Sequence, residues 1–227
     1  MQEIKKFIIE QSRKEFLKEE ERYCKILGIK PTTAEFYQIG YIPCNGISSS
    51  LWENGYKHNE YAELSLENIH NRFLFPSYSL TGGINTFYFK RNDYSDQPIW
   101  IARHYNNSDL YGADKCNSRL NYIMVVKGID NVLACTKTHI SNVVAFTDGD
   151  SLTMEQIGFL KSFENVIMAF DNDESGRKMT AKVKNSILND YIYELDFEGN
   201  DISYALKDLT ERRLIINQIK TIMAKKR

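Results

Sequence analysis

The stretch of sequence that decides the fold is Val166-Ile-Met-Ala-Phe-Asp-Asn-Asp-Glu-Ser-Gly-Arg-Lys178. Its first five residues form an apolar run that is too short for an isolated helix, and it predicts a buried strand of a parallel sheet. Because alternate residues of a strand share a face, Asp171 and Asp173 are expected to project together from the carboxyl end of this strand. Open α/β sheets place their functional sites at that end.

Two roles are compatible with this pair of carboxylates. A hard divalent cation, usually Mg²⁺, would neutralise their mutual repulsion. Alternatively, the segment is a polar turn between a strand and a helix, with Asp173 or Ser175 as the N-cap of the helix. Gly176 would let that helix begin tight against the strand. Residues 166–178 alone do not decide between the two roles.

The C-terminal half of the chain alternates between strand patterns and helix patterns. Strands are expected over 122–126, 142–146, 166–170 and 191–195, and helices over 130–137, 153–163, 176–189, 201–209 and 212–224. Such short connections between alternating elements predict a parallel sheet with right-handed crossovers. The predicted fold class is therefore α/β, with a parallel sheet flanked by helices.

The N-terminal half has a different organisation. Residues 1–29 form a long helical segment, as one long helix or two short ones, and residues 71–100 show strand patterns joined by a glycine-containing turn. A polar segment over 103–119 suggests a domain boundary near residue 119. The expected organisation is a smaller α+β subdomain over 1–119, an α/β domain over 120–210, and a basic C-terminal helix over 211–227.

Composition excludes some classes of protein. The 227 residues contain 29 Lys and Arg against 30 Asp and Glu, so overall charge does not indicate a nucleic-acid binder, although the local clusters Lys90–Arg91, Arg103–His104 and Lys225–Arg227 are basic. The four cysteines are far apart with no CxxC pair, so no structural zinc is expected. The charged start and the lack of a long apolar run predict a soluble, cytoplasmic protein without a membrane partner.

Three segments resemble the landmarks of the Toprim domain, which bacterial-type DNA primases share with type IA and II topoisomerases and some nucleases. They are Val125–Ala134, Gly149–Thr153 and Phe170–Arg177. Four upstream segments are similar, in order, to the N-terminal half of the primase RNA-polymerase core: Tyr37–Pro43, Asn71–Pro76, Gly83–Arg91 and Leu110–Gly112. The resemblance covers about residues 30–210. It identifies a phage- or plasmid-like primase core, with a Toprim-type parallel sheet preceded by the smaller subdomain.

The resemblance implies a function in DNA replication, with RNA primer synthesis on single-stranded DNA by metal-dependent nucleotidyl transfer. It implies that Asp171, Asp173 and Asp201 hold Mg²⁺ or Mn²⁺. The expected nucleic-acid or nucleotide contacts are Arg72, Lys90, Arg91, Arg103, Arg177 and Lys178. The implied partners are single-stranded DNA and nucleoside triphosphates, and a replicative helicase or another replication protein is a further possible partner. The implied location is the cytoplasm of a bacterium or of a phage-infected host. Two of these contacts have structural alternatives. Arg72 could be a charge at a strand edge, and Lys90–Arg91 could be a solvated turn.

The chain departs from the family in its first motif. Where the family has Glu-Gly-x-x-Asp, this sequence has Lys127-Gly-Ile-Asp-Asn131, and Ser203 replaces an acid two residues after Asp201. The family glutamate acts as a general acid or base, or as a metal ligand. A lysine ammonium would repel Mg²⁺, so the substitution argues against two-metal polymerisation.

Two hypotheses address the missing glutamate. In the first, Lys127 takes the place of the cation by pairing with Asp171 or Asp173. In the second, an acid on the same rim of strand ends, which is Asp130, Asp148 or Asp150, replaces the missing glutamate. For Asp148 and Asp150, the simpler role is that of a turn residue and a helix N-cap. The protein is accordingly either an active primase-like polymerase or a binding protein derived from a primase. A Toprim nuclease is less favoured, since the upstream segments resemble primases.

Overall fold

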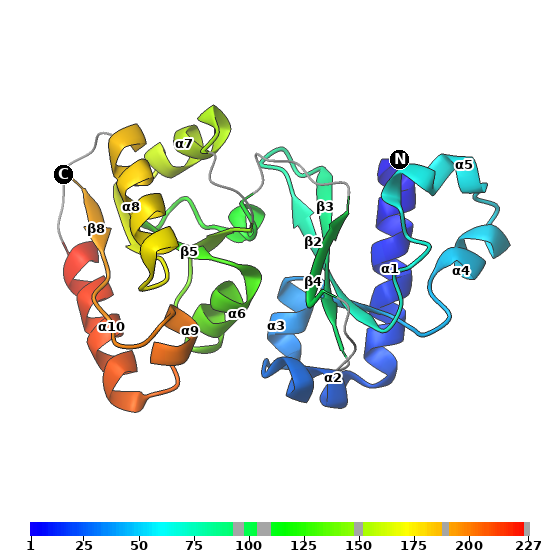
Figure 1. Ribbon diagram of the computed structural model, residues 1–227, viewed down its shortest axis with the longest axis horizontal. Helices are drawn as coiled ribbons and strands as arrows, with labels where there is room; N and C mark the ends of the chain where they lie inside the picture. The colour runs from blue at the N-terminus through cyan, green and yellow to red at the C-terminus, as the bar shows by residue number, and fades with distance from the viewer. Residues whose placement is uncertain (93–97, 104–109, 148–151, 188–190, 225–227) are drawn as a thin grey trace. The chain divides into compact units, whose positions relative to one another are not determined.

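A computed structural model describes residues 1–92, 98–103, 110–147, 152–187 and 191–224. The chain divides into two compact units, Met1–Asn106 and Asn107–Arg227, both drawn in Figure 1. The sequence suggested a boundary near residue 119. The difference arises because Tyr111 forms an antiparallel bridge with Ala145, with both N–H to O=C distances at 3.0 Å, which joins this part of the connecting segment to the second unit.

The first unit contains a four-stranded antiparallel sheet. Its order is β1 (Gly40–Ile42), β2 (Arg72–Tyr78), β3 (Ile84–Arg91) and β4 (Trp100–Arg103). The strands expected between residues 71 and 100 are confirmed, and the turn between β2 and β3 closes through a hydrogen bond from the Gly82 N–H to the Ser79 carbonyl. Strand β1 was not expected from the sequence.

The N-terminal helical segment is two helices, α1 (Gln2–Lys18) and α2 (Glu20–Leu27). Helix α1 lies along one face of the sheet (Figure 1) and packs closely on β1. A Cβ at Gly40 would lie 2.1 Å from Ser12 Oγ, so only glycine permits this approach. The remaining helices are α3 (Pro31–Phe36), α4 (Ser48–Glu53), α5 (His58–Tyr61) and the 3-10 turn η1 (Ala62–Leu64).

The second unit contains the predicted four-stranded parallel sheet. Its order is β6 (Val143–Phe146), β5 (Tyr122–Lys127), β7 (Asn165–Ala169) and β8 (Ile192–Glu194). Every residue of β7 is buried, and every residue of β5 except Lys127, as expected for central strands covered on both faces. The α/β fold class is confirmed.

Helices cover both sides of this sheet (Figure 1), and α9 and α10 follow its last strand in the chain. They are α6 (Ile129–Lys137), α7 (Met154–Lys161), α8 (Glu174–Ile187), α9 (Ile202–Ala205) and α10 (Leu209–Met223), with a 3-10 turn η2 (Ala113–Lys115). The helix expected over 201–209 ends at Ala205, because Asp208 starts a new helix by accepting the N–H groups of Thr210 and Glu211. None of the helices in the described ranges is both long and apolar enough to cross a membrane.

Candidate strand-end site in the second unit

The carboxyl ends of β5 and β7 meet at one edge of the sheet. Val126 is paired with Ala169, the last residue of β7, so Lys127 at the end of β5 lies at the same edge as the residues that follow β7. Parallel strands must place their carboxyl ends together, which is why the sequence could predict this edge as a site. The charged side chains at this edge are Lys127, Asp171, Asp173 and Asp201. The charges of Lys127, Asp173 and Asp201 all shift the pKa of the Asp171 carboxyl.

Asp171 is partly buried and lies two residues after the end of β7. Its Oδ1 atom is buried and has no hydrogen-bond partner among the described residues. Burial raises the pKa of the Asp171 carboxyl, the Lys127 ammonium opposes this by lowering it, and the carboxylates of Asp173 and Asp201 raise it further. Asp171 is therefore an under-compensated carboxylate at the edge of the sheet.

Asp173 acts as the N-cap of α8. Its Oδ1 accepts a hydrogen bond from the Gly176 N–H at 2.7 Å, so the capping role considered from the sequence is confirmed. A Cβ on Gly176 would lie 1.9 Å from the backbone oxygen of Asp171. Glycine is required here because the first turn of α8 lies directly against the end of β7.

Lys127 ends β5 with an exposed side chain. Its ammonium donates to the Ser175 hydroxyl at 3.1 Å, and in the described part of the chain it forms no ion pair with Asp171 or Asp173. The predicted direct pairing is thus replaced by a hydrogen bond to the first turn of α8. The positive charge still stabilises ionised Asp171, because Lys127 lowers the pKa of that carboxyl.

Asn131 links the first motif to the loop that carries Asp201. Its Nδ2 donates to the Lys127 carbonyl at 2.7 Å, and its Oδ1 accepts the Ser203 N–H at 3.1 Å. The Ser203 hydroxyl donates to Asp201 Oδ1 at 2.7 Å, and the same oxygen accepts the Tyr204 N–H as the cap of α9. An ionised aspartate has no donor for the Lys127 carbonyl, so asparagine suits this position.

Asn172 is a structural residue of the site that sequence reasoning missed. Its Nδ2 donates to the carbonyls of Phe197 and Gly199 at 3.0 and 2.7 Å, and its N–H donates to the Asn200 carbonyl at 2.8 Å. These bonds hold the loop before Asp201 against the end of β7. The available signal was its place between the two aspartates of the motif.

The donor set only partly fits a divalent cation. Asp171 offers an unsatisfied oxygen, but Asp173 and Asp201 each use one oxygen to cap a helix. Among the residues that the structure describes, no three His, Cys, Asp or Glu side chains are grouped to hold a metal. Asp130 lies in the first turn of α6, whereas Asp148 and Asp150 fall outside the described residues.

The basic residues expected to contact nucleic acid in the first unit lie on neighbouring strands. The register pairs Arg72 with Arg91 and Phe87 with Arg103, so these three arginines share a face of the sheet, while Lys90 lies on the opposite face. Arg72 is only 2% exposed, and its guanidinium donates to the Pro98 carbonyl at 2.9 Å. Arg72 therefore has a structural role here, and its contact with nucleic acid stays a prediction.

Two further basic side chains are held by local contacts. Arg103 Nε donates to the Ser65 carbonyl at 2.9 Å. The Lys90 ammonium lies 5.3 Å from the centre of the Trp100 ring, a cation–π contact on the partly exposed end of the sheet. His104 and Lys225–Arg227 fall outside the described residues.

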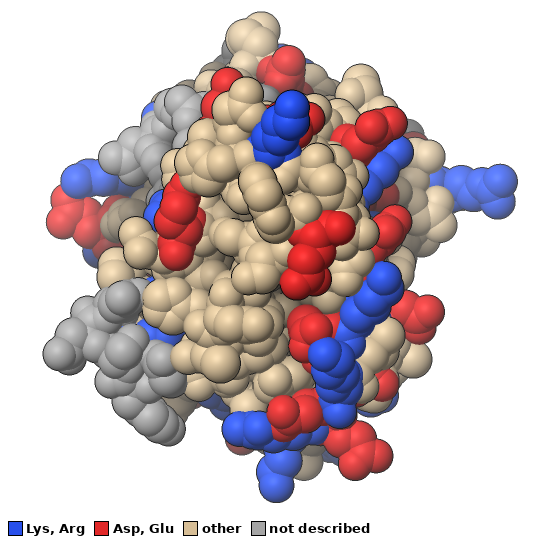
Figure 2. All heavy atoms as spheres, turned by 90° about the vertical axis from the view of Figure 1, so that its right-hand side faces the viewer, with Lys and Arg blue, Asp and Glu red and all other residues tan. Residues whose placement is uncertain are grey.

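On α8, Arg177 and Lys178 are both exposed, and Lys178 pairs with Glu174 at 2.6 Å. Elsewhere the surface charges are mixed. On the face drawn in Figure 2, Lys and Arg side chains are interspersed with Asp and Glu, and the described residues in view form no continuous basic stripe.

Comparisons with known proteins agree with this geometry. Residues 121–205 match the Toprim domain family. The chain is 28% identical over 199 residues to the DNA primase of Haemophilus influenzae, an alignment that covers 78% of this chain and 33% of that protein. The chain thus spans about a third of the length of this curated relative.

Solved structures of primase catalytic cores have the same fold. The Aquifex aeolicus primase, comprising zinc-binding and RNA polymerase domains, gives a TM-score of 0.76 at 23% identity and covers 93% of this chain and 59% of that one. A DnaG primase catalytic domain bound to single-stranded DNA gives a TM-score of 0.74 at 19% identity and covers 88% and 70%. At these identities the likeness establishes the fold.

Proposed function

We propose that this chain, which contains a Toprim domain and is a homologue of bacterial-type DNA primases, acts in DNA replication by binding single-stranded DNA and nucleoside triphosphates. The observation that carries the proposal is the strand-end site, where the Lys127 ammonium lies beside Asp171 in a primase-core fold. The protein would work in the cytoplasm of a bacterium or of a phage-infected host.

Nucleotide binding is supported by basic side chains that lie at and near this edge of the sheet, beside its carboxylates. Lys127 is exposed and fixed by the Ser175 hydroxyl, and Arg177 and Lys178 lie exposed in the first turns of α8. Ammonium and guanidinium groups bind phosphate oxygens strongly. The Lys127 ammonium, held in place by Ser175, would then provide part of the positive charge that a metal ion provides at the phosphates in an active polymerase.

Binding of single-stranded DNA is supported by the pair formed by Lys90 and Trp100. An aromatic ring with an adjacent cation suits a stacked base and its phosphate, and such stacking is tolerant of sequence. The Trp100 ring also lies 5.1 Å from the Phe75 ring, which holds it in place. The DnaG catalytic domain that shares the fold is described as bound to single-stranded DNA, which agrees with this assignment.

Standard two-metal polymerisation is disfavoured by the same site. An ammonium a few ångströms from a divalent cation costs several kcal/mol at an intermediate effective dielectric. If Mg²⁺ or Mn²⁺ binds, Asp171, Asp173 and Asp201 would hold it, and it would neutralise the charge on the phosphates. The second candidate function is RNA primer synthesis with a bound metal ion. It is favoured by the buried Oδ1 of Asp171, which has no hydrogen-bond partner among the described residues.

The experiment that separates the two candidates measures binding and primer synthesis on the same protein. We expect the wild type to bind single-stranded DNA and to make no primers with Mg²⁺ or Mn²⁺. Trp100→Ala should weaken DNA binding by roughly 5- to 150-fold, equivalent to about 1–3 kcal/mol for one stacked base. The matched control is Trp52→Ala, because Trp52 is 69% exposed on α4 and is assigned no DNA contact.

Primer synthesis by the wild type that disappears in Asp171→Ala/Asp173→Ala would instead establish the second candidate. If the wild type makes no primers and Lys127→Glu does, the lysine alone blocks catalysis. If only Lys127→Glu/Asn131→Asp makes primers, both substitutions block it. Equal loss of DNA binding in the two tryptophan variants would contradict the assignment of Trp100.

A further inference from the structure

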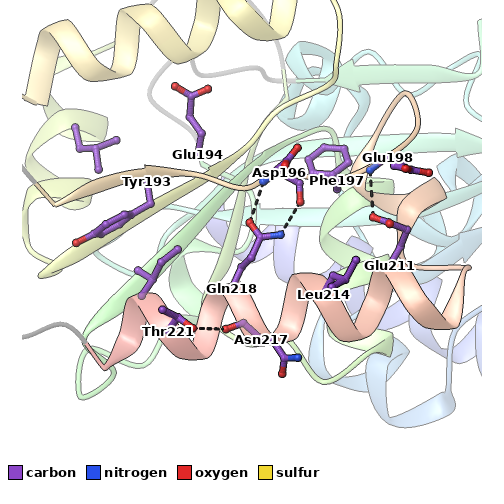
Figure 3. Close-up of a pocket in the computed structure, with 12 residues that line it drawn as sticks. Tyr193, Glu194, Asp196, Phe197, Glu198, Glu211, Leu214, Asn217, Gln218 and Thr221 are labelled. Atoms are coloured by element: carbon purple, nitrogen blue, oxygen red, sulfur yellow. Dashed lines mark hydrogen bonds between the residues drawn. The ribbon is translucent and has the colours of Figure 1, made fainter.

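An open groove of about 760 Å³ runs along the second unit between strand β8 and helix α10 (Figure 3). Its walls are β8 with the loop up to Glu198 on one side, and α10 from Glu211 to Ile222 on the other. None of the residues of the strand-end site lines it. The proposed function therefore leaves the groove without a role.

The edge of the sheet is open along this groove. Strand β8 is the last strand of the sheet, and the Val166 N–H bonds to the Tyr191 carbonyl while the Leu195 N–H bonds to the Met168 carbonyl. In a parallel ladder this pattern turns the backbone N–H and C=O of Ile192 and Glu194 away from β7. Within the described chain no hydrogen bond satisfies these groups, and such an edge is a template for another strand.

Beyond β8 the edge is closed by side chains of α10. Gln218 accepts the Asp196 N–H at 3.1 Å and donates to the Asp196 carbonyl at 2.6 Å, and Glu211 accepts the Glu198 N–H at 3.2 Å (Figure 3). These contacts fix the wall of the groove opposite α10. The unpaired backbone is thus limited to β8 itself.

The charge of the groove indicates what it would bind. Of its twelve lining residues, four carry a carboxylate and none is a lysine or arginine. Glu194 pairs with Lys184, whereas Asp196 and Glu198 are exposed and have no cationic partner in the part of the chain that is described. A phosphate backbone would be repelled here, and pairing β8 with a second copy would bring like carboxylates together.

We infer that the β8–α10 groove binds an extended, lysine- or arginine-rich segment of a partner protein, which joins the sheet as a fifth strand beside β8. Main-chain hydrogen bonds to Ile192 and Glu194 supply the affinity, as in other cases of strand addition. The basic side chains of the segment meet Asp196 and Glu198. Its apolar side chains lie against Tyr193 and against Leu214, which is 50% exposed.

The test uses the whole protein and a fluorescent peptide of alternating lysine and valine, with binding measured by fluorescence anisotropy. A second peptide of the same sequence carries N-methyl groups on alternate backbone nitrogens, which removes strand pairing and keeps the charge. We expect the first peptide to bind and N-methylation to weaken it at least about tenfold, or about 1.4 kcal/mol. Ile192→Pro should weaken it similarly, because proline removes the outward N–H and is tolerated on an edge strand.

Charge is tested separately. Asp196→Lys/Glu198→Lys should weaken binding, and the matched control Glu155→Lys/Glu164→Lys, which changes net charge equally at exposed sites of the same unit, should not. The proposal is overturned if the N-methylated peptide binds equally well, or if neither peptide binds. The two peptides on the wild type decide the matter even if Ile192→Pro does not fold.

Discussion

Asp171 shows how a single residue of this site depends on its neighbours. Its carboxyl is partly withdrawn from water, one oxygen lacks a hydrogen-bond partner among the described residues, and two further carboxylates act on it. Burial and these two charges raise its pKa, and Lys127 only partly offsets them. Ionised Asp171 is therefore less favourable in the folded protein than in the unfolded chain.

This predicts that Asp171→Asn stabilises the protein at about pH 7. A raised folded-state pKa means that Asp171 stabilises the fold below its ordinary pKa and that this contribution is lost as the pH rises through the raised value. The melting temperature of Asp171→Asn should exceed that of the wild type by a few degrees at about pH 7, and the difference should vanish at about pH 3. Thermal unfolding against pH measures this.

Asp196→Asn is the control, because Asp196 is exposed in a loop of the same unit. An advantage of Asp171→Asn that grew as the pH fell would show that the carboxylate is stabilised by the fold, and the assigned cause would be wrong.

At the scale of elements, the junction between β7 and α8 sets the geometry of the site. The helix starts so close to the strand that position 176 admits no side chain, and its first turn provides both the Ser175 hydroxyl for Lys127 and the N–H for Asp173. The positions of the two motif aspartates therefore depend on glycine.

We predict that Gly176→Ala destabilises the protein by about 1–3 kcal/mol, because the new methyl group forces a backbone shift. Gly158→Ala in α7 is the matched control, since nothing lies within 4 Å of the added Cβ and alanine favours a helix by about 0.5–1 kcal/mol. Urea unfolding measures both. Equal effects of the two changes would mean that the close contact at Gly176 is not a determinant of stability.

The elements also show what a sequence pattern can predict. The four parallel strands were predicted because their apolar runs are short, contiguous and separated by helix patterns. The helix expected over 201–209 is shorter in the structure, and strand β1 was not expected. Asp208 starts the next helix inside the range predicted for the first, and β1 is three residues that gain their partner only in the sheet.

At the scale of the whole molecule, the boundary between the two units follows from contacts distant in sequence. Leu110 and Tyr111 are 4% and 1% exposed, and Tyr111 pairs with Ala145 of β6. A fragment over 107–227 should therefore fold as a unit, with a core separate from that of the first unit.

A fragment over 120–227 should be less stable, by about 1.5–3 kcal/mol for each of the two large buried side chains that it loses. Circular dichroism during thermal unfolding of the two fragments checks this prediction. Equal stability would move the boundary back to the polar segment near residue 119.

The sequence by itself determined the α/β class of the second unit and the strand-end position of Asp171 and Asp173. These follow from local periodicity and from the rule that parallel strands end at a common edge. The departures at Lys127, Asn131 and Ser203 follow from comparing the sequence with the family motif that it resembles. Only the tertiary structure decided that Lys127 bonds to Ser175, that Asn131 connects to Ser203, that Arg72 is buried, and that β8 leaves an open edge beside α10. The physical reason is that each of these contacts joins segments that lie far apart in the chain, so no local pattern encodes them.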